Sequence, residues 1–289
     1  MTGMKENLLL LARELSLPPE VLPPLETAAD RLPPDLPLTA PASQDAAGAV
    51  WAETSARLPA WEADDGMAQL AAVLAAACET RKIYQRSGIS DAVFLDTMGC
   101  LPRFLEETKT ITGRWAFDRG FWTWRQTAGL LFRLGELEYE YAPSEKADFL
   151  RVGPGTPTLH VHIPSDAALT REKLDASYAE AWRFFSAEGS AFCENGPPKA
   201  MVCDSWLLAP ALDELLPESS GIRRFARDYE RVRIEEDDDS FYRWLFRKAG
   251  PVPLSELAED SSLQRAVKAR LTAGGRIGMA WGVLRKEER

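Results

Sequence analysis

The chain has 289 residues, of which 45% are hydrophobic and 27% are charged, and this composition indicates a folded protein long enough for two domains. Its formal net charge of −10 and its pI near 5.0 predict repulsion from phosphate backbones, which argues against a nucleic-acid partner. No apolar run approaches the ~20 residues that cross a bilayer, so a membrane partner is not expected either.

Two further features indicate where the protein works. The apolar run "LLLLA" at Leu8–Ala12 is too short for a signal peptide, and no small-residue cleavage site follows it. The four cysteines are widely scattered and form no CxxC pair: Cys78, Cys100, Cys193 and Cys203. Together these observations predict reduced thiols in a cytoplasmic protein.

A helical pattern dominates the first part of the chain. Residues 1–16 predict a short helix. The proline-rich segment 17–44 predicts short helical pieces joined by turns, because its eight prolines exclude one continuous helix. Over Met67–Cys78 the apolar residues recur with a period of 3.6, and Ser90 is suited to the N-cap of a further helix. We therefore predict a helical N-terminal domain over residues 1–115.

From residue 116 the hydrophobic pattern shifts toward a period of two, which is typical of strands. The segment "WTWRQTAGLLFRLGELEYEYA" predicts a hairpin with one strand up to Leu134, a turn at Gly135 and a second strand over Glu136–Tyr141. Further strands are expected in Thr156–Ile163, "KAMVCDSWLLAP", "YERVRIEE" and "RIGMAWGVLRK", with helices near Arg171–Ala187 and Leu212–Leu216. The fold class is thus α+β, with a mixed β-sheet flanked by helices over residues 116–289.

This order of elements resembles the fold of the GNAT superfamily of N-acetyltransferases. The segments "RQTAGLLFRLGELEYEY", "LHVHIPSDAALT" with the following "ASYAEAWRFF", and "CDSWLLAPALDELLP" are similar to a bacterial family of N-acyltransferases. Members of that family pair a helical N-terminal domain with a GNAT-like C-terminal domain. The resemblance implies an enzyme that moves an acyl group from acyl-CoA, acetyl-CoA or longer, to an amine on a small molecule or peptide. It implies no metal.

In that fold the CoA pyrophosphate binds in the loop between a strand and the long helix that follows it. The corresponding residues here are Ser165, Asp166, Ala167, Ala168, Leu169, Thr170, Arg171 and Lys173. The usual Gln/Arg-x-x-Gly-x-Gly/Ala loop is absent and "PSDAALT" stands in its place, so the backbone is less free to approach a phosphate. Arg171 and Lys173 could meet phosphates in the first helical turn. The alternative is an ordinary strand-to-helix connection with Thr170 as N-cap.

Both histidines of the chain, His160 and His162, lie in the strand before this loop and share one face of it. A neutral imidazole can take the proton of an attacking amine, directly or through water. Arylalkylamine N-acetyltransferases have a His-x-His on the similar strand, and of the two histidines His162 is favoured because it lies nearer the loop. Two alternatives stay open. The histidines could be metal ligands completed by Asp or Glu, or partly buried residues hydrogen-bonded beneath a helix.

Three further groups are candidates. Glu136, Glu138 and Glu140 share a face of the neighbouring strand; if this face lines the cleft, a carboxylate such as Glu138 could serve as base or bind an ammonium group. Otherwise they are a solvated edge. Ser205 could protonate the leaving thiolate, whereas Cys203 is more typical of a small core residue.

Two other functions remain compatible with the sequence. One is a catalytically inactive GNAT-like binding or regulatory module, which the missing glycine loop favours. The other is a metal-dependent enzyme that uses His160 and His162.

Overall fold

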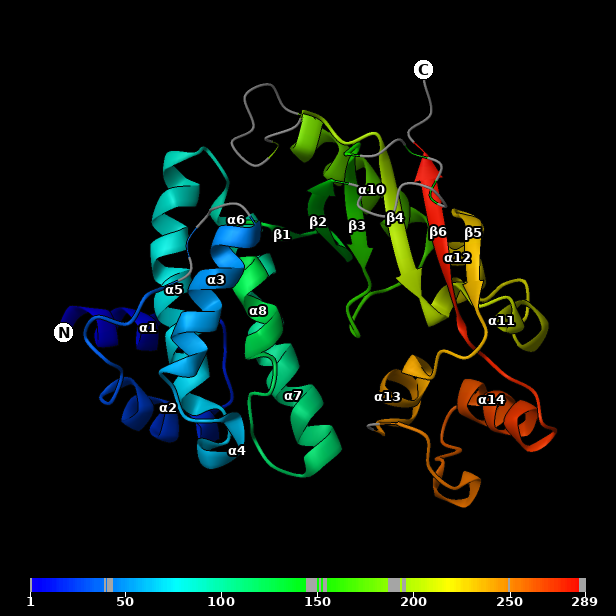
Figure 1. The fold of residues 1–289 in the computed structure, drawn as a ribbon, viewed down its shortest axis with the longest axis horizontal. Coiled ribbons are helices and arrows are strands. Elements are labelled where there is room, and N and C mark those ends of the chain that lie inside the picture. The colour runs from blue at the N-terminus through cyan, green and yellow to red at the C-terminus, as the bar shows by residue number, and fades with distance from the viewer. Residues whose placement is uncertain are drawn as a thin grey trace. The chain divides into compact units, whose positions relative to one another are not determined.

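The computed structural model describes residues 2–38, 40, 44–143, 150, 152, 155–186, 193, 196–248 and 250–285. The chain divides into two compact units, Met1–Leu134 and Gly135–Arg289. The predicted fold class is confirmed. The described part of the first unit is helical until β1 at its end, and the second unit contains a mixed sheet flanked by helices (Figure 1). The predicted domain boundary at residues 115 and 116 stays a prediction.

The N-terminal unit is built from short helices around one long alanine-rich helix, α5. Its elements are α1 Thr2–Glu14, η1 Pro19–Val21, α2 Leu22–Ala29, α3 Gln44–Ala56, α4 Trp61–Asp64, α5 Met67–Arg86, α6 Asp91–Met98, α7 Cys100–Thr112, α8 Gly120–Thr127 and β1 Leu131–Leu134. The predicted N-cap of α6 is confirmed, since the Ser90 side chain accepts a hydrogen bond from the Val93 N–H at 3.3 Å. The fully buried Tyr84 of α5 stacks on Phe132 of β1 at 5.3 Å between ring centroids.

The predicted strand between residues 122 and 134 is wrong in its first half, because Gly120–Thr127 forms α8. The buried residues of this helix include Gly120, Thr123, Trp124 and Thr127, which recur at helical spacing. Three of these four residues are glycine or threonine, so the buried stripe of α8 cannot be recognised from the spacing of hydrophobic residues in the sequence.

The second unit is organised around the sheet, whose strand order is β1-β2-β3-β4-β6-β5. Its strands are β2 Leu137–Pro143, β3 Pro157–His162, β4 Ala200–Ser205, β5 Glu230–Glu235 and β6 Met279–Arg285. Its helices are α10 Arg171–Ser186, η2 Trp206–Leu208, α11 Ala211–Leu215, α12 Gly221–Arg227, α13 Ser240–Phe246, η3 Leu254–Glu256 and α14 Ser262–Thr272. Strands β3 and β4 are parallel and α10 connects them, whereas β2 with β3, β4 with β6 and β5 with β6 are antiparallel.

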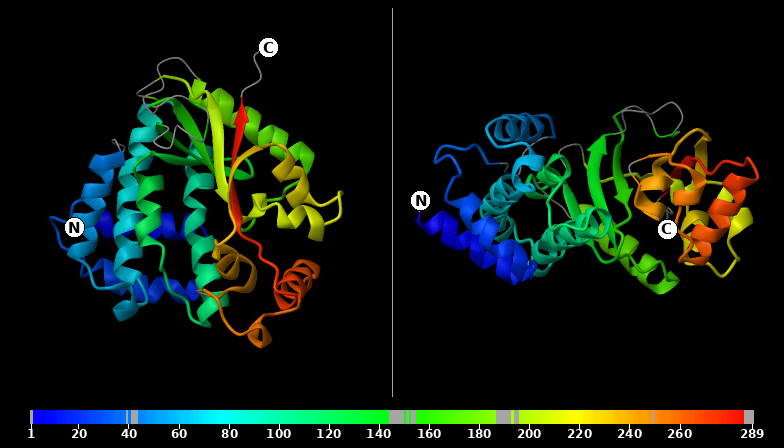
Figure 2. Two further views of the ribbon diagram at one scale, coloured as in Figure 1. Left: turned by 45° about the vertical axis from the view of Figure 1, so that its right-hand side comes forward. Right: turned by 90° about the horizontal axis from the view of Figure 1, so that it is seen from below.

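Helix α10 lies along one face of this sheet (Figure 2). The Tyr139 hydroxyl of β2 is 2.9 Å from the Ser177 hydroxyl of α10, and the rings of Tyr141 and Phe185 stack at 6.2 Å. Tyr139 and Tyr141 lie opposite Val161 and Leu159 of β3, so these four side chains define the face that α10 covers.

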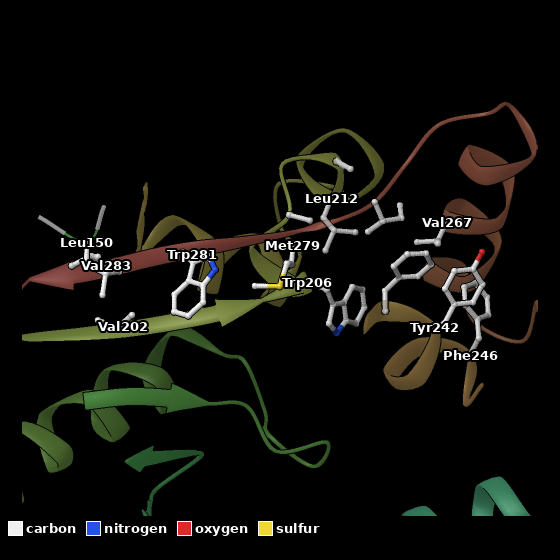
Figure 3. Close-up of a cluster of buried hydrophobic side chains, with 14 of the residues drawn as sticks. Leu150, Val202, Trp206, Leu212, Tyr242, Phe246, Val267, Met279, Trp281 and Val283 are labelled. Carbon is white, nitrogen blue, oxygen red and sulfur yellow. The ribbon is translucent and has the colours of Figure 1, made fainter. Parts of the chain in front are cut away.

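An apolar cluster covers the face of β4 and β6 that is opposite to α10, and it packs this face against helices α11, α13 and α14 (Figure 3). Val202 of β4 and Val283 of β6 are register partners within it, together with Trp281 of β6. Trp206 and side chains of α11, α13 and α14 complete the cluster. Because Val202 is also the register partner of His160, the face that bears the histidines continues into this cluster.

Candidate active site

The parallel strands β3 and β4 are paired over a short distance only. Among the described residues, the register runs from Thr158 with Ala200 to His160 with Val202 and then ends. Beyond that point β3 remains paired with β2 as far as His162, while β4 remains paired with β6 as far as Ser205. The two strands therefore separate at their C-terminal ends, and backbone groups at these ends are not engaged with one another.

The two histidines stand at the start of this separation, on the face opposite to α10. His160 lies opposite Glu140 and His162 opposite Glu138 in the antiparallel register with β2. Directly opposite residues point to the same side, so two imidazoles and two carboxylates share one patch of the sheet. The expectation that the histidines share a face is confirmed, and neither ring lies beneath α10. Both are partly exposed.

The carboxylates of this patch are buried rather than solvated. Glu138 is 3% exposed and Glu140 is 8% exposed, so the alternative of a solvated edge is wrong for both. Burying a carboxylate is costly unless a partner compensates the lost hydration. For Glu140 such a partner is His162, whose Nε2 is 3.1 Å from Glu140 Oε2.

The segment predicted to bind phosphate forms a compact turn in front of α10. The N–H of Ala167 donates to the Pro164 carbonyl at 3.0 Å, and the N–H of Thr170 donates to the Ala168 carbonyl at 2.9 Å. The N–H of Ala168 donates to Glu136 Oε2 at 2.7 Å, and Glu136 Oε1 is 2.7 Å from Lys173 Nζ. A carboxylate of the chain thus occupies the position near the helix N-terminus where an anion would be stabilised.

The second cation of this segment is held by two carboxylates. Arg171 donates to Asp228 Oδ1 at 2.6 Å and pairs with Asp175 at 2.6 Å. Asp228 also accepts a hydrogen bond from the Tyr178 hydroxyl at 3.2 Å. Burial, and then the charge of Asp228, raise the pKa of Tyr178 above its usual range, so this phenol stays protonated at neutral pH. The pair Arg171–Asp228 fixes the first turn of α10 against the loop before β5.

The two remaining candidates lie on β4. Ser205 Oγ accepts a hydrogen bond from the Leu207 N–H at 3.1 Å, which caps the short helix η2. Cys203 is fully buried on the α10 side of the sheet, and burial raises the pKa of its thiol well above the usual range. A protonated, inaccessible thiol cannot act as a nucleophile, in line with the interpretation of Cys203 as a core residue.

In the part of the chain that the structure describes, no group of three His, Cys, Asp or Glu side chains is arranged to hold a metal ion. Within the same residues, no helix combines the length and the apolar character needed to span a bilayer.

The mixed sheet, with α10 connecting the parallel strands β3 and β4 and their pairing ending at His160, agrees with the GNAT-like fold that the sequence predicts. The model of the "GNAT-like C-terminal domain" matches residues 131–284, more than half of the chain, and the model of the "N-acyltransferase N-terminal domain" matches residues 6–129. The chain belongs to this family of N-acyltransferases. The predicted resemblance and the predicted class of enzyme are confirmed.

Solved acyltransferases have the same fold along almost the whole chain. One, in complex with decanoyl-CoA and teicoplanin, is 25% identical with a TM-score of 0.74, and the match covers 95% of this chain and 86% of that one. A mutant acyltransferase in complex with octanoyl-CoA is 24% identical with a TM-score of 0.67, over 96% and 99% of the two chains. No curated protein matches this chain.

Sequence reasoning missed Asp228 and did not distinguish Glu140 from the two other glutamates of its strand. Asp228 follows α12, a helix that was not predicted, and its pairing with Arg171 joins residues 57 positions apart. Glu140 was considered as one of three glutamates on a strand face, but no local pattern singled it out. What could have singled out Glu140 is its position opposite His160 on the neighbouring strand. That position is known only when the register of β2 with β3 is known.

Proposed function

We propose that this protein transfers an acyl group from acyl-CoA to the amine of a small molecule or peptide. The single observation that supports this reaction most is the separation of β3 and β4 directly beside the His162–Glu140 pair. The open strand ends offer backbone N–H groups to a thioester carbonyl, and the imidazole lies next to them. Because related acyltransferases were solved with octanoyl-CoA and decanoyl-CoA, we include these acyl chains among the donors.

The chemistry needs one proton acceptor and one proton donor. The amine nitrogen attacks the thioester carbon, the C–N bond forms and the C–S bond breaks. His162 takes the proton from the nitrogen, and the departing thiolate is protonated to CoA-SH. His160 and Glu138, on the same face, are the alternative acceptors. Ser205 is the candidate donor, because a hydroxyl that accepts from a backbone N–H still has its own hydrogen to give.

We assign the phosphates of CoA to the segment from Ser165 to Lys173 and the reaction to the cytoplasm. The segment precedes a helix of 16 residues and contains two cations in the first turn of that helix. The cytoplasmic assignment is supported by the cysteines, all four of which are free thiols.

A panel of CoA, acetyl-CoA, octanoyl-CoA and decanoyl-CoA tests this function. Ligands that bind the native state raise Tm, by an amount that follows their affinity. Thioesters that raise Tm should also release CoA-SH when an amine library is added, with the acylated product visible by mass spectrometry. Binding without release would favour the non-catalytic binding module, and no rise with any CoA species would contradict the proposal.

The double variant Arg171→Glu with Lys173→Glu should weaken CoA binding by about 1–3 kcal/mol, or roughly 5- to 150-fold, because two charge-assisted hydrogen bonds to phosphate are lost. Isothermal titration calorimetry measures the effect. The matched control is Arg183→Glu in the last turn of α10, a charge reversal on the same helix away from the segment. Equal affinities in all three proteins would remove this segment as the phosphate site.

Replacing Glu136 by glutamine should raise the affinity for CoA by roughly 3- to 10-fold, because the carboxylate that now contacts Ala168 and Lys173 would compete with phosphate. Glu172→Gln is the control. It also removes one negative charge near the segment, from the first turn of α10, but Glu172 does not make the contacts that Glu136 makes with Ala168 and Lys173. A gain in both variants would indicate a general effect of net charge, and weaker binding of the Glu136 variant would show that Glu136 supports the site.

A further inference from the structure

The carboxylate of Glu140 contacts His162, which is not its direct register partner. In the register of β2 with β3, Glu140 lies opposite His160 and Glu138 lies opposite His162. The oxygen Oε2 of Glu140 nevertheless approaches Nε2 of His162 to 3.1 Å, along the diagonal of the strand pair. Diagonal neighbours on one face of an antiparallel pair are within reach of long side chains. The contact therefore joins Glu140 to the imidazole that lies beyond the last paired residue of β3 and β4.

The Glu140–His162 pair is mostly, but not fully, shielded from water. The side chain of Glu140 is 10% exposed and that of His162 is 23% exposed. An electrostatic contact in such a setting is screened much less than one on the surface, and it restricts the rotation of both side chains. The pair lies just past His160, the last residue at which β3 is paired with β4.

An ionised Glu140 would also select one tautomer of His162. Because an ionised carboxylate only accepts hydrogen bonds, it requires Nε2–H of His162 as the donor. In a neutral imidazole the lone pair is then on Nδ1, and Nδ1 is the nitrogen that can accept a proton. Once Nδ1 is protonated, the ring has a positive charge next to the Glu140 carboxylate.

We propose that Glu140 is the positioning residue of this enzyme. It holds His162 in the tautomer whose Nδ1 faces the reaction and stabilises the imidazolium that forms when the amine loses its proton. Glu140 does not exchange a proton itself: one proton moves from the amine nitrogen to Nδ1, and Nε2–H stays in place. This inference rests on the proposed function, in which His162 is the base.

A double-mutant cycle tests the proposal. Glu140→Gln keeps the shape and a hydrogen-bond acceptor but removes the charge, and we expect kcat to fall by roughly 10- to 10³-fold with KM for acyl-CoA unchanged. In the His162→Gln background the same substitution should change kcat by less than about twofold, because Glu140 acts only through His162. Equal losses in both backgrounds would overturn the proposal, and so would an unchanged kcat in the single variant. Glu140→Asp should recover part of the loss, since it restores the charge at a longer distance.

A second readout does not depend on turnover. The protein has only two histidines, so ¹⁵N NMR of imidazole-labelled protein resolves both tautomers, and the His160→Gln variant identifies the signals of His162. We expect the Nε2–H tautomer for His162 in the parent and a loss of this preference in Glu140→Leu, which fills the same space without an acceptor. A parent in which His162 has its hydrogen on Nδ1 would contradict the proposal, even in a fully active enzyme.

The failure of the inference can be told from the failure of the proposed function. A slow His162→Gln variant combined with a normal Glu140→Gln variant overturns the positioning role alone. A normal His162→Gln variant removes the base on which the inference rests. An absence of acyl transfer from any acyl-CoA overturns the proposed reaction itself, and in that case the tautomer of His162 still decides whether Glu140 orients the ring.

Discussion

Replacing His162 by glutamine should lower kcat by roughly 10²- to 10⁴-fold, the usual contribution of a general base, while the fold and the affinity for CoA are kept. Glutamine is close in size to histidine and can still hydrogen-bond to Glu140, so the buried carboxylate keeps a partner. What it cannot do is accept a proton from the amine. Rates should be measured per folded molecule, with Tm and CoA affinity determined on the same samples.

The matched comparison is His160→Gln, because both imidazoles lie on the same face of β3 and it is the Nε2 of His162 that contacts Glu140 at 3.1 Å. We expect the larger loss in the His162 variant. A larger loss in the His160 variant would transfer the role of base to that residue. If both glutamine variants lose stability but keep their rates, the histidines are structural.

Replacing Gly66 by alanine should destabilise the N-terminal unit by about 3 kcal/mol or more and lower Tm by on the order of 10 °C. Gly66 is the N-cap of α5 and has φ +75°, a left-handed conformation that costs a side-chain residue about 1–2 kcal/mol. A Cβ at this position would also overlap the backbone carbonyl of Phe117, which no side-chain rotation can relieve. Thermal and urea denaturation measure the change.

The control is Gly88→Ala. Gly88 has φ +73°, nearly the same conformation, but no atom lies within 4 Å of the position that its Cβ would occupy. It should therefore show only the backbone cost of about 1–2 kcal/mol. The difference between the two variants isolates the steric overlap with Phe117. Equal losses would mean that the backbone around residue 117 moves aside without a measurable cost.

The sequence alone determined the elements that local periodicity and capping encode. The stripe of α5, the N-cap Ser90 and the alternation of β3 each depend on residues a few positions apart, so a single segment contains the whole signal. For the same reason the shared face of His160 and His162 was predictable, because it follows from the period of two along one strand. The helix α8 was not predictable in this way, since Trp124 is the one large apolar residue of its packed stripe and the others are Gly120, Thr123 and Thr127.

Only the tertiary structure decided which polar groups meet and which are buried. Glu140 and His162 are 22 positions apart, Glu136 and Ala168 are 32 apart, and Arg171 and Asp228 are 57 apart. The same three-residue alternation Glu136, Glu138, Glu140 fits a solvated edge or a buried patch, and the choice depends on what packs against it. In the folded chain the first of these glutamates contacts the turn before α10 and the other two are buried beside the histidines. Register and burial are properties of paired segments, and no single segment of the sequence encodes them.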